Sequence, residues 1–254
     1  MKYIPLLPVL ALLLCACGAP AEQAPSSDEA LPPVQSDISA DPTISDSTAS
    51  ETTSEPPTEP TIPDNTAPEA TPEDADFVRV TDYIPTIEVD LKYATKDNFT
   101  DSVIYDFSDA YLRYGTVKKL QAVSDIIAAD GYSLKIWDAF RPTQAQFKLW
   151  EICPDPVYVS NPNKGFSSHS RGNTLDVTLI HTDGSAVEMP TDFDDFSALA
   201  DRDYSDVPES AAANARYLES VMKAQGFKPY QGEWWHFSDT DTYEVDSSFQ
   251  PPQS

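Results

Sequence analysis

Residues 167–179 read SSHSRGNTLDVTL and combine a histidine with a predicted strand that carries an aspartate. This stretch holds His169, one of only three histidines in 254 residues, seven positions before Asp176. The run of β-branched and aliphatic residues around Asp176 predicts a strand. Gly172 allows the backbone to turn just before that strand. The pattern therefore places a histidine in a turn and a carboxylate on the adjoining strand.

A second segment, GEWWHFSD at residues 232–239, supplies Glu233 and His236. Two histidines and one carboxylate suit a catalytic zinc ion, because three protein ligands leave the fourth tetrahedral position for water. His169, Asp176 and His236 are the candidate ligands, and Glu233 is the candidate base that takes a proton from that water. Positions three apart on a regular strand face opposite sides. Glu233 and His236 can therefore converge only where the chain is irregular, and the glycine before Glu233 favours a bulge or turn there.

The same residues also fit purely structural roles, and their spacing alone does not separate the two interpretations. In the structural interpretation His169 is a loop histidine, Asp176 is a salt-bridge partner, and EWWH is an aromatic core strand with polar ends. His181 lies between two strand-like runs in IHTDGSAV and is expected to be a solvent-facing turn residue. Three tryptophans are expected in the core and the pocket wall: Trp137, Trp234 and Trp235.

Periodic apolar patterns extend over residues 77–249, a length that suffices for one domain with its own core. Three helices are predicted, in TVKKLQAVSDIIAADG (116–131), in QAQFKLWEI (144–152) with Thr143 as its N-cap, and in AAANARYLESVMKAQG (211–226). The apolar stripe of the first helix is expected to be Val117, Leu120, Val123, Ile126 and Ile127.

Strands are predicted for YSLKIWDAF (132–140) and NTLDVTLI (173–180), and a broken strand for FKPYQGEWWHFSD (227–239). These helices and strands do not alternate regularly along the chain. The arrangement indicates the α+β class and not a doubly wound parallel sheet.

The first 17 residues have the layout of an export signal, with one lysine, a short apolar run and then small residues. The apolar run is shorter than the roughly 20 residues of a membrane-spanning helix. Its end, LCAC, resembles a bacterial lipobox with Cys17 as the lipidated residue. The sequence predicts an exported lipoprotein, at the cell surface or in the periplasm, with a lipid anchor on Cys17 in a bacterial membrane. An ordinary secretory signal is the alternative.

The predicted linker at residues 18–76 has a different composition from the rest of the chain. Between Ala19 and Asp76 there are fourteen acidic residues and no lysine, arginine or aromatic residue. Such a segment cannot bury enough apolar surface to offset its ordering entropy, and its prolines and like charges extend it. We expect a disordered acidic stalk. It carries just over half of the formal net charge of −26, and this acidity argues against nucleic acid as a partner.

Several ordered motifs resemble those of zinc D,D-peptidases. SSHSRGNTLD matches the pattern S-x-H-x-x-G-x-A-x-D, with Thr174 where the pattern has alanine, and EWWH matches E-x-W-H. Within that group the chain resembles the VanX-type D-alanyl-D-alanine dipeptidases most closely. The supporting stretches are LKYATKDNFT (91–100), IWDAFRP (136–142), FDDF (193–196) and GFKPYQGEWWHF (226–237). The resemblance covers nearly all of the folded part and none of the stalk.

The resemblance implies one zinc D,D-dipeptidase domain over residues 77–249, with a central, mostly antiparallel sheet flanked by helices, and a tail at 250–254. It implies that His169, Asp176 and His236 bind one zinc ion per chain. It also implies that Glu233 is the general base and later passes its proton to the leaving amine.

Arg141, in DAFRP, is by resemblance the residue that stabilises the tetrahedral oxyanion. Fixed positive charge aimed at developing negative charge is strongly stabilising in a dry site. Asp138, just upstream, is expected to orient Arg141. The alternative role for Arg141 is a surface salt bridge before a helix.

A free D,D-dipeptide carries an ammonium end, so its pocket should offer an anion. Asp194 in FDDF matches the amine-recognising aspartate of the family, with Asp195 as a neighbour that could be confused with it. Ser167 and Tyr93 match other substrate-binding positions, as a hydrogen-bonding group and as pocket wall. Each of the two could instead be structural, Tyr93 as a strand aromatic and Ser167 as a turn former.

The expected activity is zinc-dependent hydrolysis of D-alanyl-D-alanine or a similar small D,D-dipeptide. A D,D-carboxypeptidase that trims peptidoglycan stem peptides is the near alternative, because it uses the same metal chemistry and because export favours wall-linked substrates. A non-catalytic, wall-binding surface lipoprotein is the second alternative, although it would have no need for Glu233. Export also favours scavenging of wall-derived D-amino acids over a role in glycopeptide resistance, which requires the enzyme to meet free dipeptide in the cytoplasm.

Overall fold

The structure of the protein, a computed structural model, describes residues 71–253. The expected signal at residues 1–17, its lipidation site Cys17 and residues 18–70 of the expected stalk lie outside the described residues. Between residues 71 and 253, no helix has both the length and the apolar character needed to cross a membrane.

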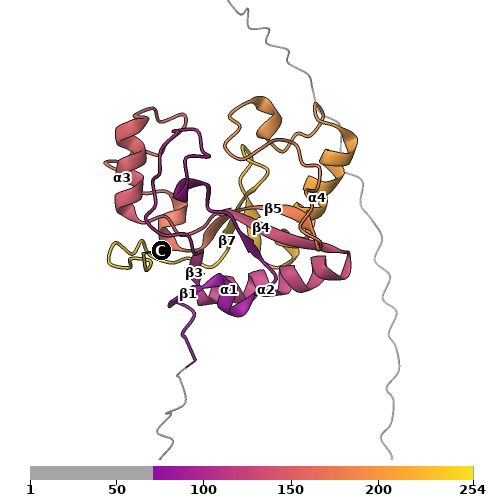
Figure 1. Cartoon of the computed structure of the whole chain (residues 1–254), viewed down its shortest axis with the longest axis horizontal. Coiled ribbons are helices and arrows are strands. Elements are labelled where there is room, and N and C mark those ends of the chain that lie inside the picture. The colour runs from indigo at the N-terminus through magenta and orange to yellow at the C-terminus, as the bar shows by residue number, and fades with distance from the viewer. Residues whose placement is uncertain (1–70, 254) are drawn as a thin grey trace, which may run out of the picture. The chain divides into compact units, whose positions relative to one another are not determined.

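A central sheet runs through the domain (Figure 1). It has five strands in the order β2-β4-β5-β7-β6. The strands are β2 (Glu88–Val89), β4 (Tyr132–Asp138), β5 (Thr174–His181), β7 (His236–Asp239) and β6 (Phe227–Pro229). Within this sheet β2 and β4 are parallel, and the other neighbouring pairs are antiparallel. The expected α+β class with a mostly antiparallel central sheet is confirmed.

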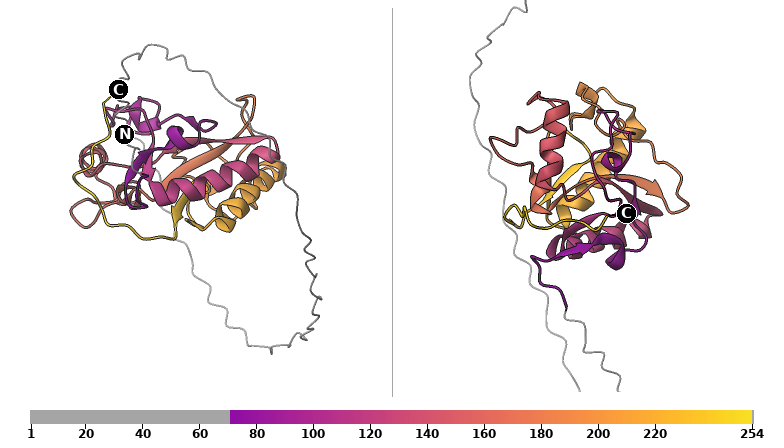
Figure 2. Two further views of the ribbon diagram at one scale, coloured as in Figure 1. Left: turned by 90° about the horizontal axis from the view of Figure 1, so that it is seen from below. Right: turned by 60° about the vertical axis from the view of Figure 1, so that its left-hand side comes forward.

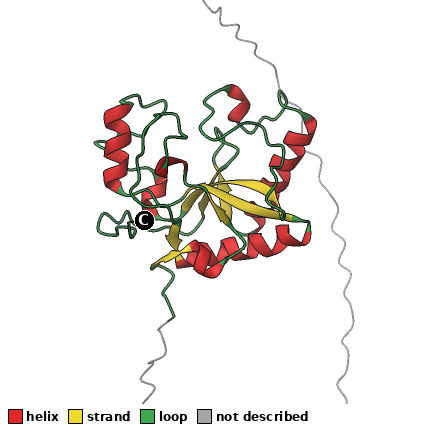
Figure 3. Ribbon diagram, viewed as in Figure 1, coloured by secondary structure: helices red, strands yellow, loops and turns green. Residues whose placement is uncertain are grey.

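Two long helices lie side by side against one face of the sheet (Figure 2). They are α2 (Tyr114–Ala129), which contacts β4, and α4 (Glu209–Ala224), which contacts β5 and β6. On the side of the sheet away from α2 lie α3 (Thr143–Ile152) and long loops (Figure 3). The short helical segments are α1 (Val80–Tyr83), η1 (Lys92–Ala94), η2 (Ser168–Arg171) and η3 (Ala198–Ala200).

The face of α2 that packs on the sheet follows the predicted apolar stripe at four of five positions. The buried residues of the stripe are Val117, Leu120, Val123 and Ile127. The prediction for Ile126 is wrong, because this side chain is 39% exposed. Ile126 lies about 100° around the helix axis from Ile127, and this rotation carries it past the edge of the buried face.

The start of α3 also differs from its prediction. The helix begins at Thr143 itself, Pro142 occupies the N-cap position, and no side chain caps the first turn. The fixed φ of proline suits the extended conformation that an N-cap adopts. The hydroxyl of Thr143 is therefore inside the helix and does not act as its cap.

The expected broken strand is a hairpin of β6 and β7. The two strands pair antiparallel, with Phe227 opposite Asp239 and Pro229 opposite Phe237, and residues 230–235 connect them. The three tryptophans expected in the core and the pocket wall are all buried, and none lines the cavity described below: Trp137, Trp234 and Trp235. Burial of the indole rings holds the irregular connection against the core, which fixes where Glu233 and His236 lie.

A second, two-stranded sheet brings the two ends of the described chain together. It pairs β1 (Phe77–Arg79) with β3 (Tyr111–Arg113) in antiparallel fashion. The guanidinium group of Arg113 donates to the backbone oxygens of Ala75 at 2.6 Å and Glu244 at 3.2 Å. The ring of Phe77 stacks on that of Phe249, with centroids 4.1 Å apart. Residues from both ends of the described range therefore pack beside β3.

Candidate metal centre

Three neighbouring strands place three polar side chains in one row across the sheet. Asp176 on β5 is directly opposite Asp138 on β4 and directly opposite His236 on β7. Residues opposite one another in antiparallel strands project from the same face. An irregularity in the pairing between Ile136 and Asp138 is what brings Asp138 into this row. A bulge of this kind re-aims the side chain that follows it.

His169 reaches the row from η2, the short turn that precedes β5. The hydroxyl of Ser167 accepts a hydrogen bond from the backbone nitrogen of His169 at the start of this turn. Gly172 ends it with φ +75°, a left-handed conformation that glycine adopts without strain. The ring nitrogen Nδ1 of His169 lies 2.8 Å from the carbonyl oxygen of Ala139. Because a carbonyl can only accept, Nδ1 carries the proton and Nε2 is free to act as a ligand.

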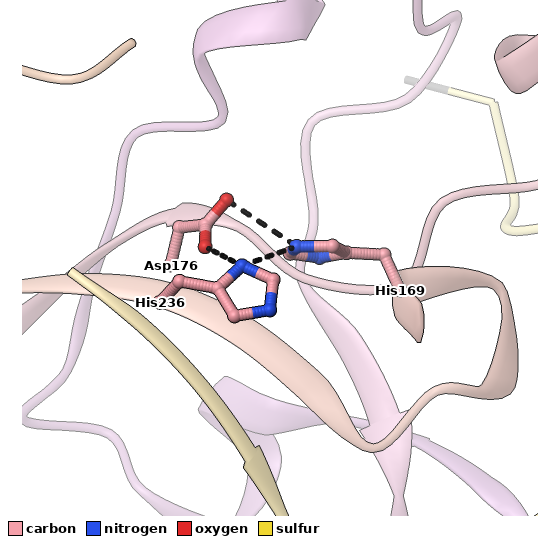
Figure 4. A group of neighbouring side chains, drawn as sticks. All are labelled: His169, Asp176 and His236. Atoms are coloured by element: carbon pink, nitrogen blue, oxygen red, sulfur yellow. Dashed lines mark hydrogen bonds and ion pairs between the residues drawn. The ribbon is translucent and has the colours of Figure 1, made fainter. Parts of the chain in front are cut away.

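The three expected ligands converge (Figure 4). His169, Asp176 and His236 each offer a ligand atom, and these atoms lie within 4.8 Å of one another. His169 Nε2 is 3.4 Å from Asp176 Oδ2 and 3.4 Å from His236 Nδ1. Asp176 Oδ1 is buried with no hydrogen-bond partner, although His236 Nδ1 is only 3.0 Å away. A buried carboxylate oxygen left unpaired beside two imidazoles fits a divalent cation among them.

Charge within this group favours an ionised carboxylate. Burial alone would raise the pKa of Asp176, but His169 and His236 outweigh it and hold that pKa well below its usual range. Burial alone would lower the pKa of His169. The carboxylates of Asp176 and Asp138 outweigh this effect, so the pKa of His169 is raised. Positive charge beside Asp176 thus stabilises its carboxylate, and a metal cation among the three residues would supply such charge.

Glu233 lies beside the metal ligands, in the connection between β6 and β7. Its Oε2 atom is 3.4 Å from His236 Nδ1, and its side chain is 33% exposed. The chain is irregular here, as the convergence of Glu233 with His236 requires, and the turn is marked by a long hydrogen bond from His236 N to Glu233 O at 3.4 Å. Burial, followed by the nearby charge of Asp176, raises the pKa of Glu233. A carboxylate with a raised pKa is suited to accept and return a proton.

Arg141 is held by the strand that ends at Asp138. Its NH2 group donates to Asp138 Oδ2 at 2.7 Å, and its NH1 group donates to Gln146 Oε1 at 3.2 Å. Asp138 is itself fixed by the hydroxyl of Tyr105, at 2.7 Å. Burial would lower the pKa of Arg141, but Asp138 outweighs it, so the guanidinium stays charged. Its Nε is buried without a hydrogen-bond partner, which leaves a donor unused in the site.

A cavity of about 370 Å³ opens above these groups. Its walls include the metal ligands, Glu233, Arg141 and all three expected substrate-binding residues, Tyr93, Ser167 and Asp194. Its remaining lining residues are Pro156, Val157, Tyr158, Ser160, Phe166, Ser168, Phe196 and Tyr230. The volume is at the small end of the roughly 300–1,000 Å³ of ligand pockets, so it suits a small ligand.

The structure separates Asp194 from Asp195. Asp194 lines the cavity, and the hydroxyl of Tyr93 donates to its Oδ2 at 2.7 Å. Asp195 instead accepts from the backbone nitrogen of Ser197 at 2.8 Å and is not among the lining residues. Burial raises the pKa of Asp194 to about 7, against the lowering effect of the Tyr93 hydroxyl. The aspartate that faces the cavity is therefore the one expected to bind an amine.

His181 lies away from the cavity, as expected. It is the exposed last residue of β5, and its ring stacks on Tyr132 at 5.5 Å. Sequence reasoning missed Tyr105 and Gln146, which hold Asp138 and Arg141. Neither residue belongs to a recognisable sequence motif, so only the fold shows that they contact the site.

Comparisons with known proteins identify one family for the part of the chain that holds these residues. A family model described as "D-ala-D-ala dipeptidase" matches residues 73–253. The chain is similar to a D-alanyl-D-alanine dipeptidase of Escherichia coli K12, 38% identical over 153 residues, 60% of this chain and 79% of that one. It is 35% identical to that of Streptomyces coelicolor over 201 residues, 70% of this chain and 98% of that one. It is 32% identical to that of Enterococcus faecalis over 193 residues, 68% and 96% of the two chains.

Proposed function

The chain belongs to the D-Ala-D-Ala dipeptidase family of M15 metallopeptidases, and we propose from this premise that it hydrolyses free D-alanyl-D-alanine or a similar small D,D-dipeptide at a single zinc ion. The observation that carries the proposal is the group of three ligand atoms within 4.8 Å of one another, beside the Glu233 carboxylate and the guanidinium of Arg141, which Asp138 fixes. Each of these groups has a distinct place in the cleavage of an amide.

His169, Asp176 and His236 would hold the zinc ion. Nitrogen and carboxylate ligands in this number are those of catalytic zinc sites, which keep one position open. When bound, zinc supplies a Lewis acid and lowers the pKa of a water ligand to about 7. The proton on His169 Nδ1 is already committed to Ala139, so the ring is oriented for ligation before any ion arrives.

Glu233 acts first as the general base and then as the general acid. It takes a proton from the water that attacks the scissile carbonyl and delivers it to the nitrogen of the leaving D-alanine. Because the pKa of Glu233 is raised, it lies closer to the pKa values of the water and the amine with which Glu233 exchanges the proton. Its partial exposure at the cavity wall gives it access to both the water and the peptide nitrogen.

Arg141 stabilises the negative charge that develops on the carbonyl oxygen. The Asp138 carboxylate and Gln146 fix two arms of the guanidinium, and these contacts remove the cost of reorienting it during the reaction. The Nε donor is buried and has no protein partner. Such an arrangement favours the transition state over the neutral substrate.

Asp194 binds the free ammonium group of the dipeptide, with Tyr93 holding the carboxylate in place. Ser167 offers its hydroxyl at the cavity wall. The small cavity volume supports a dipeptide over a peptidoglycan stem peptide, which is the substrate in the alternative function as a D,D-carboxypeptidase. The presence of Glu233 beside the ligands supports catalysis over the second alternative, a non-catalytic wall-binding protein.

We also propose that the protein is an exported lipoprotein, attached to a bacterial membrane through Cys17. The lipobox-like sequence LCAC supports this, and the acidic segment before the folded domain would act as a spacer. The expected stalk ends earlier than residue 76, because residues 74–76 contact Lys118, Arg113 and Tyr114 of the domain. Such a location would allow the enzyme to recover D-alanine from dipeptide released outside the cytoplasm. Metabolic labelling with a fatty acid analogue tests it, and a Cys17→Ala protein that is still labelled would contradict it.

The test of the catalytic assignment is Glu233→Gln. We expect kcat for release of D-alanine from D-Ala-D-Ala to fall by about 10²–10⁴-fold, while the variant retains one zinc ion per chain. Glu151→Gln, on the exposed side of α3, is the matched control and should behave as wild type. A Glu233→Gln protein with full activity would overturn the role given to Glu233. Faster hydrolysis of a muropeptide ending in D-Ala-D-Ala than of free dipeptide would favour the carboxypeptidase.

A further inference from the structure

The lining of the cavity divides into a buried floor and an exposed rim. His169 and Asp176, on the floor, are 2% and 3% exposed. Tyr158 and Phe196 also line the cavity but are 47% and 44% exposed. Large aromatic side chains at this exposure therefore lie at the mouth of the cavity, where a substrate enters.

The two exposed rings touch each other. Their centroids are 4.7 Å apart and their planes are inclined by 57°. Tyr158 belongs to the connection between α3 and η2, and Phe196 belongs to the connection between β5 and η3. The contact therefore joins two loops that are separate along the chain, and both of these loops contribute residues to the cavity.

The ring pair is anchored to the substrate-binding wall. Phe196 packs edge-on against Phe99, with centroids 5.2 Å apart, and Phe99 packs against Tyr93 at 6.4 Å. Tyr93 in turn holds Asp194 through its hydroxyl. On the other loop, the backbone nitrogens of Tyr158 and Val159 both donate to Asp155. The pair therefore has support on both sides and is more than a chance contact of surface residues.

The position of the pair along the chain relates it to the amine end of the substrate. Phe196 follows Asp194 by two residues, and Asp194 is the residue to which the proposed function assigns the ammonium group. Asp194, Tyr158 and Phe196 all line the same cavity, so the proposed site of the ammonium group and the ring pair belong to one substrate-binding space.

We propose that the Tyr158–Phe196 ring pair determines the length of peptide that the enzyme accepts. The two rings close the cavity beyond the amine of a dipeptide, so that a peptide extended on that side is excluded by bulk as well as by loss of the ammonium contact. This inference rests on the proposed function, because it assumes hydrolysis of D-Ala-D-Ala with the amine at Asp194. Tyr158 and Phe196 are thus specificity-determining residues for that reaction.

The test separates bulk from charge by its choice of substrates. In N-acetyl-D-Ala-D-Ala and in the stem pentapeptide ending in D-Ala-D-Ala, the nitrogen of the penultimate D-alanine is acylated and carries no charge. The two substrates differ in the size of the group attached to that nitrogen. D-Alanine release from each is measured for wild type, Tyr158→Ala and Phe196→Ala. We expect the ratio of kcat/KM for pentapeptide to that for N-acetyl-D-Ala-D-Ala to rise by about tenfold or more in both variants. Where wild type shows no pentapeptide cleavage, the variants should bring it above the detection limit.

Two further variants serve as controls. Tyr83→Ala removes an exposed ring that packs on Tyr114, outside the cavity lining, and it should leave the ratio unchanged. Tyr158→Phe keeps the ring and should keep the discrimination. A ratio in Tyr158→Ala and Phe196→Ala equal to that of wild type would overturn the inference, as would an equal rise in Tyr83→Ala. Circular dichroism melting of each variant confirms that it is folded.

Hydrolysis of unmodified D-Ala-D-Ala by wild type separates failure of the proposed function from failure of the role given to the ring pair. If wild type does not release D-alanine from the free dipeptide, the proposed function fails. If wild type cleaves the dipeptide and the ring variants show no change in selectivity, the proposed function stands and the role of the ring pair fails.

Discussion

Asp194 illustrates how the surroundings of a single carboxyl group set its chemistry. The group is buried at the cavity wall, and burial raises its pKa to about 7 even though Tyr93 donates a hydrogen bond to it. Below that pH the side chain is protonated and neutral, and above it the side chain is an anion. Only the anion forms an ion pair with the ammonium group of a dipeptide. Substrate binding should therefore strengthen as pH rises toward 7.

We predict that KM for D-Ala-D-Ala rises as pH falls below about 7, by up to tenfold per pH unit, because the fraction of ionised Asp194 falls in that proportion. In Asp194→Asn this dependence should be lost and KM at pH 8 should be about 10–100 times that of wild type, the effect of losing one charge-assisted contact. Steady-state kinetics from pH 5 to 8 measure both effects. Asp195→Asn is the matched control, and a KM increase in that variant instead would transfer the role to Asp195.

At the scale of residues, the sequence alone indicated much of the candidate site. His169, Asp176, His236 and Glu233 stand out because chemically distinctive residues recur at fixed spacing in a chain with few histidines. A sequence motif does not show which of two adjacent aspartates faces the cavity. Asp194 and Asp195 differ through backbone conformation, since Asp194 has φ +53°, and this could not be deduced from the letters FDDF.

At the scale of elements, the irregular points of regular strands build the site. The shift in pairing before Asp138 sends that carboxylate to the same face as Asp176 and His236. Bulges depend on the registers of two strands, which single-sequence patterns do not carry. For this reason the sequence suggested that Asp138 orients Arg141 only through a family likeness, while the structure supplies the physical cause.

Arg202 anchors the connection between β6 and β7 through hydrogen bonds to backbone oxygens at both of its ends. Its side chain is 3% exposed, and its guanidinium donates to the backbone oxygens of Tyr230 at 2.7 Å and His236 at 3.1 Å. It also pairs with Glu219 at 3.0 Å. The connection spanned by these contacts carries Glu233 and ends at a metal ligand. Arg202 is therefore a positioning residue for the hairpin.

We predict that Arg202→Lys lowers the free energy of unfolding by about 2–4 kcal/mol and lowers kcat/KM as well. One ammonium group cannot satisfy all the acceptors of the planar guanidinium, and each buried carbonyl left unpaired costs about 1–3 kcal/mol. Thermal melting and D-alanine release measure the two effects. Arg216→Lys, which removes an exposed arginine stacked near Tyr204, is the control and should change neither. Wild-type stability and activity in Arg202→Lys would contradict the positioning role.

At the scale of the whole molecule, the metal centre joins segments that are far apart along the chain. His169 comes from η2, Asp176 from β5 and His236 from β7, and the unfolded chain does not hold these side chains together. An ion that binds only the folded state stabilises it by mass action. Binding of the catalytic ion should therefore also stabilise the fold.

We predict that zinc in about hundredfold excess over its dissociation constant stabilises the folded chain by about 2.7 kcal/mol. For a domain of this size, that corresponds to a rise in Tm of about 5–10 °C. Calorimetry of the chelator-treated chain with and without zinc measures the shift. Glu233→Gln should show the same shift, and His169→Ala should not. A shift retained in His169→Ala would place the ion elsewhere.

The α+β class and the principal helices and strands could be predicted from apolar periodicity, because most of these elements bury one face. Errors arose where tertiary packing decides. Ile126 lies at the edge of the buried stripe of α2, and Pro142 took the capping place expected of Thr143. The packing of Phe77 on Phe249, which joins residues 172 positions apart, has no signature in local sequence.

Zinc titration of the metal-free protein, followed by release of D-alanine from D-Ala-D-Ala, tests most directly whether one zinc ion is required for catalysis. We expect no release without metal, a linear return of activity with added zinc, and a plateau at one zinc ion per chain. Full activity in the metal-free protein, or a plateau reached without binding to His169, Asp176 and His236, would contradict it.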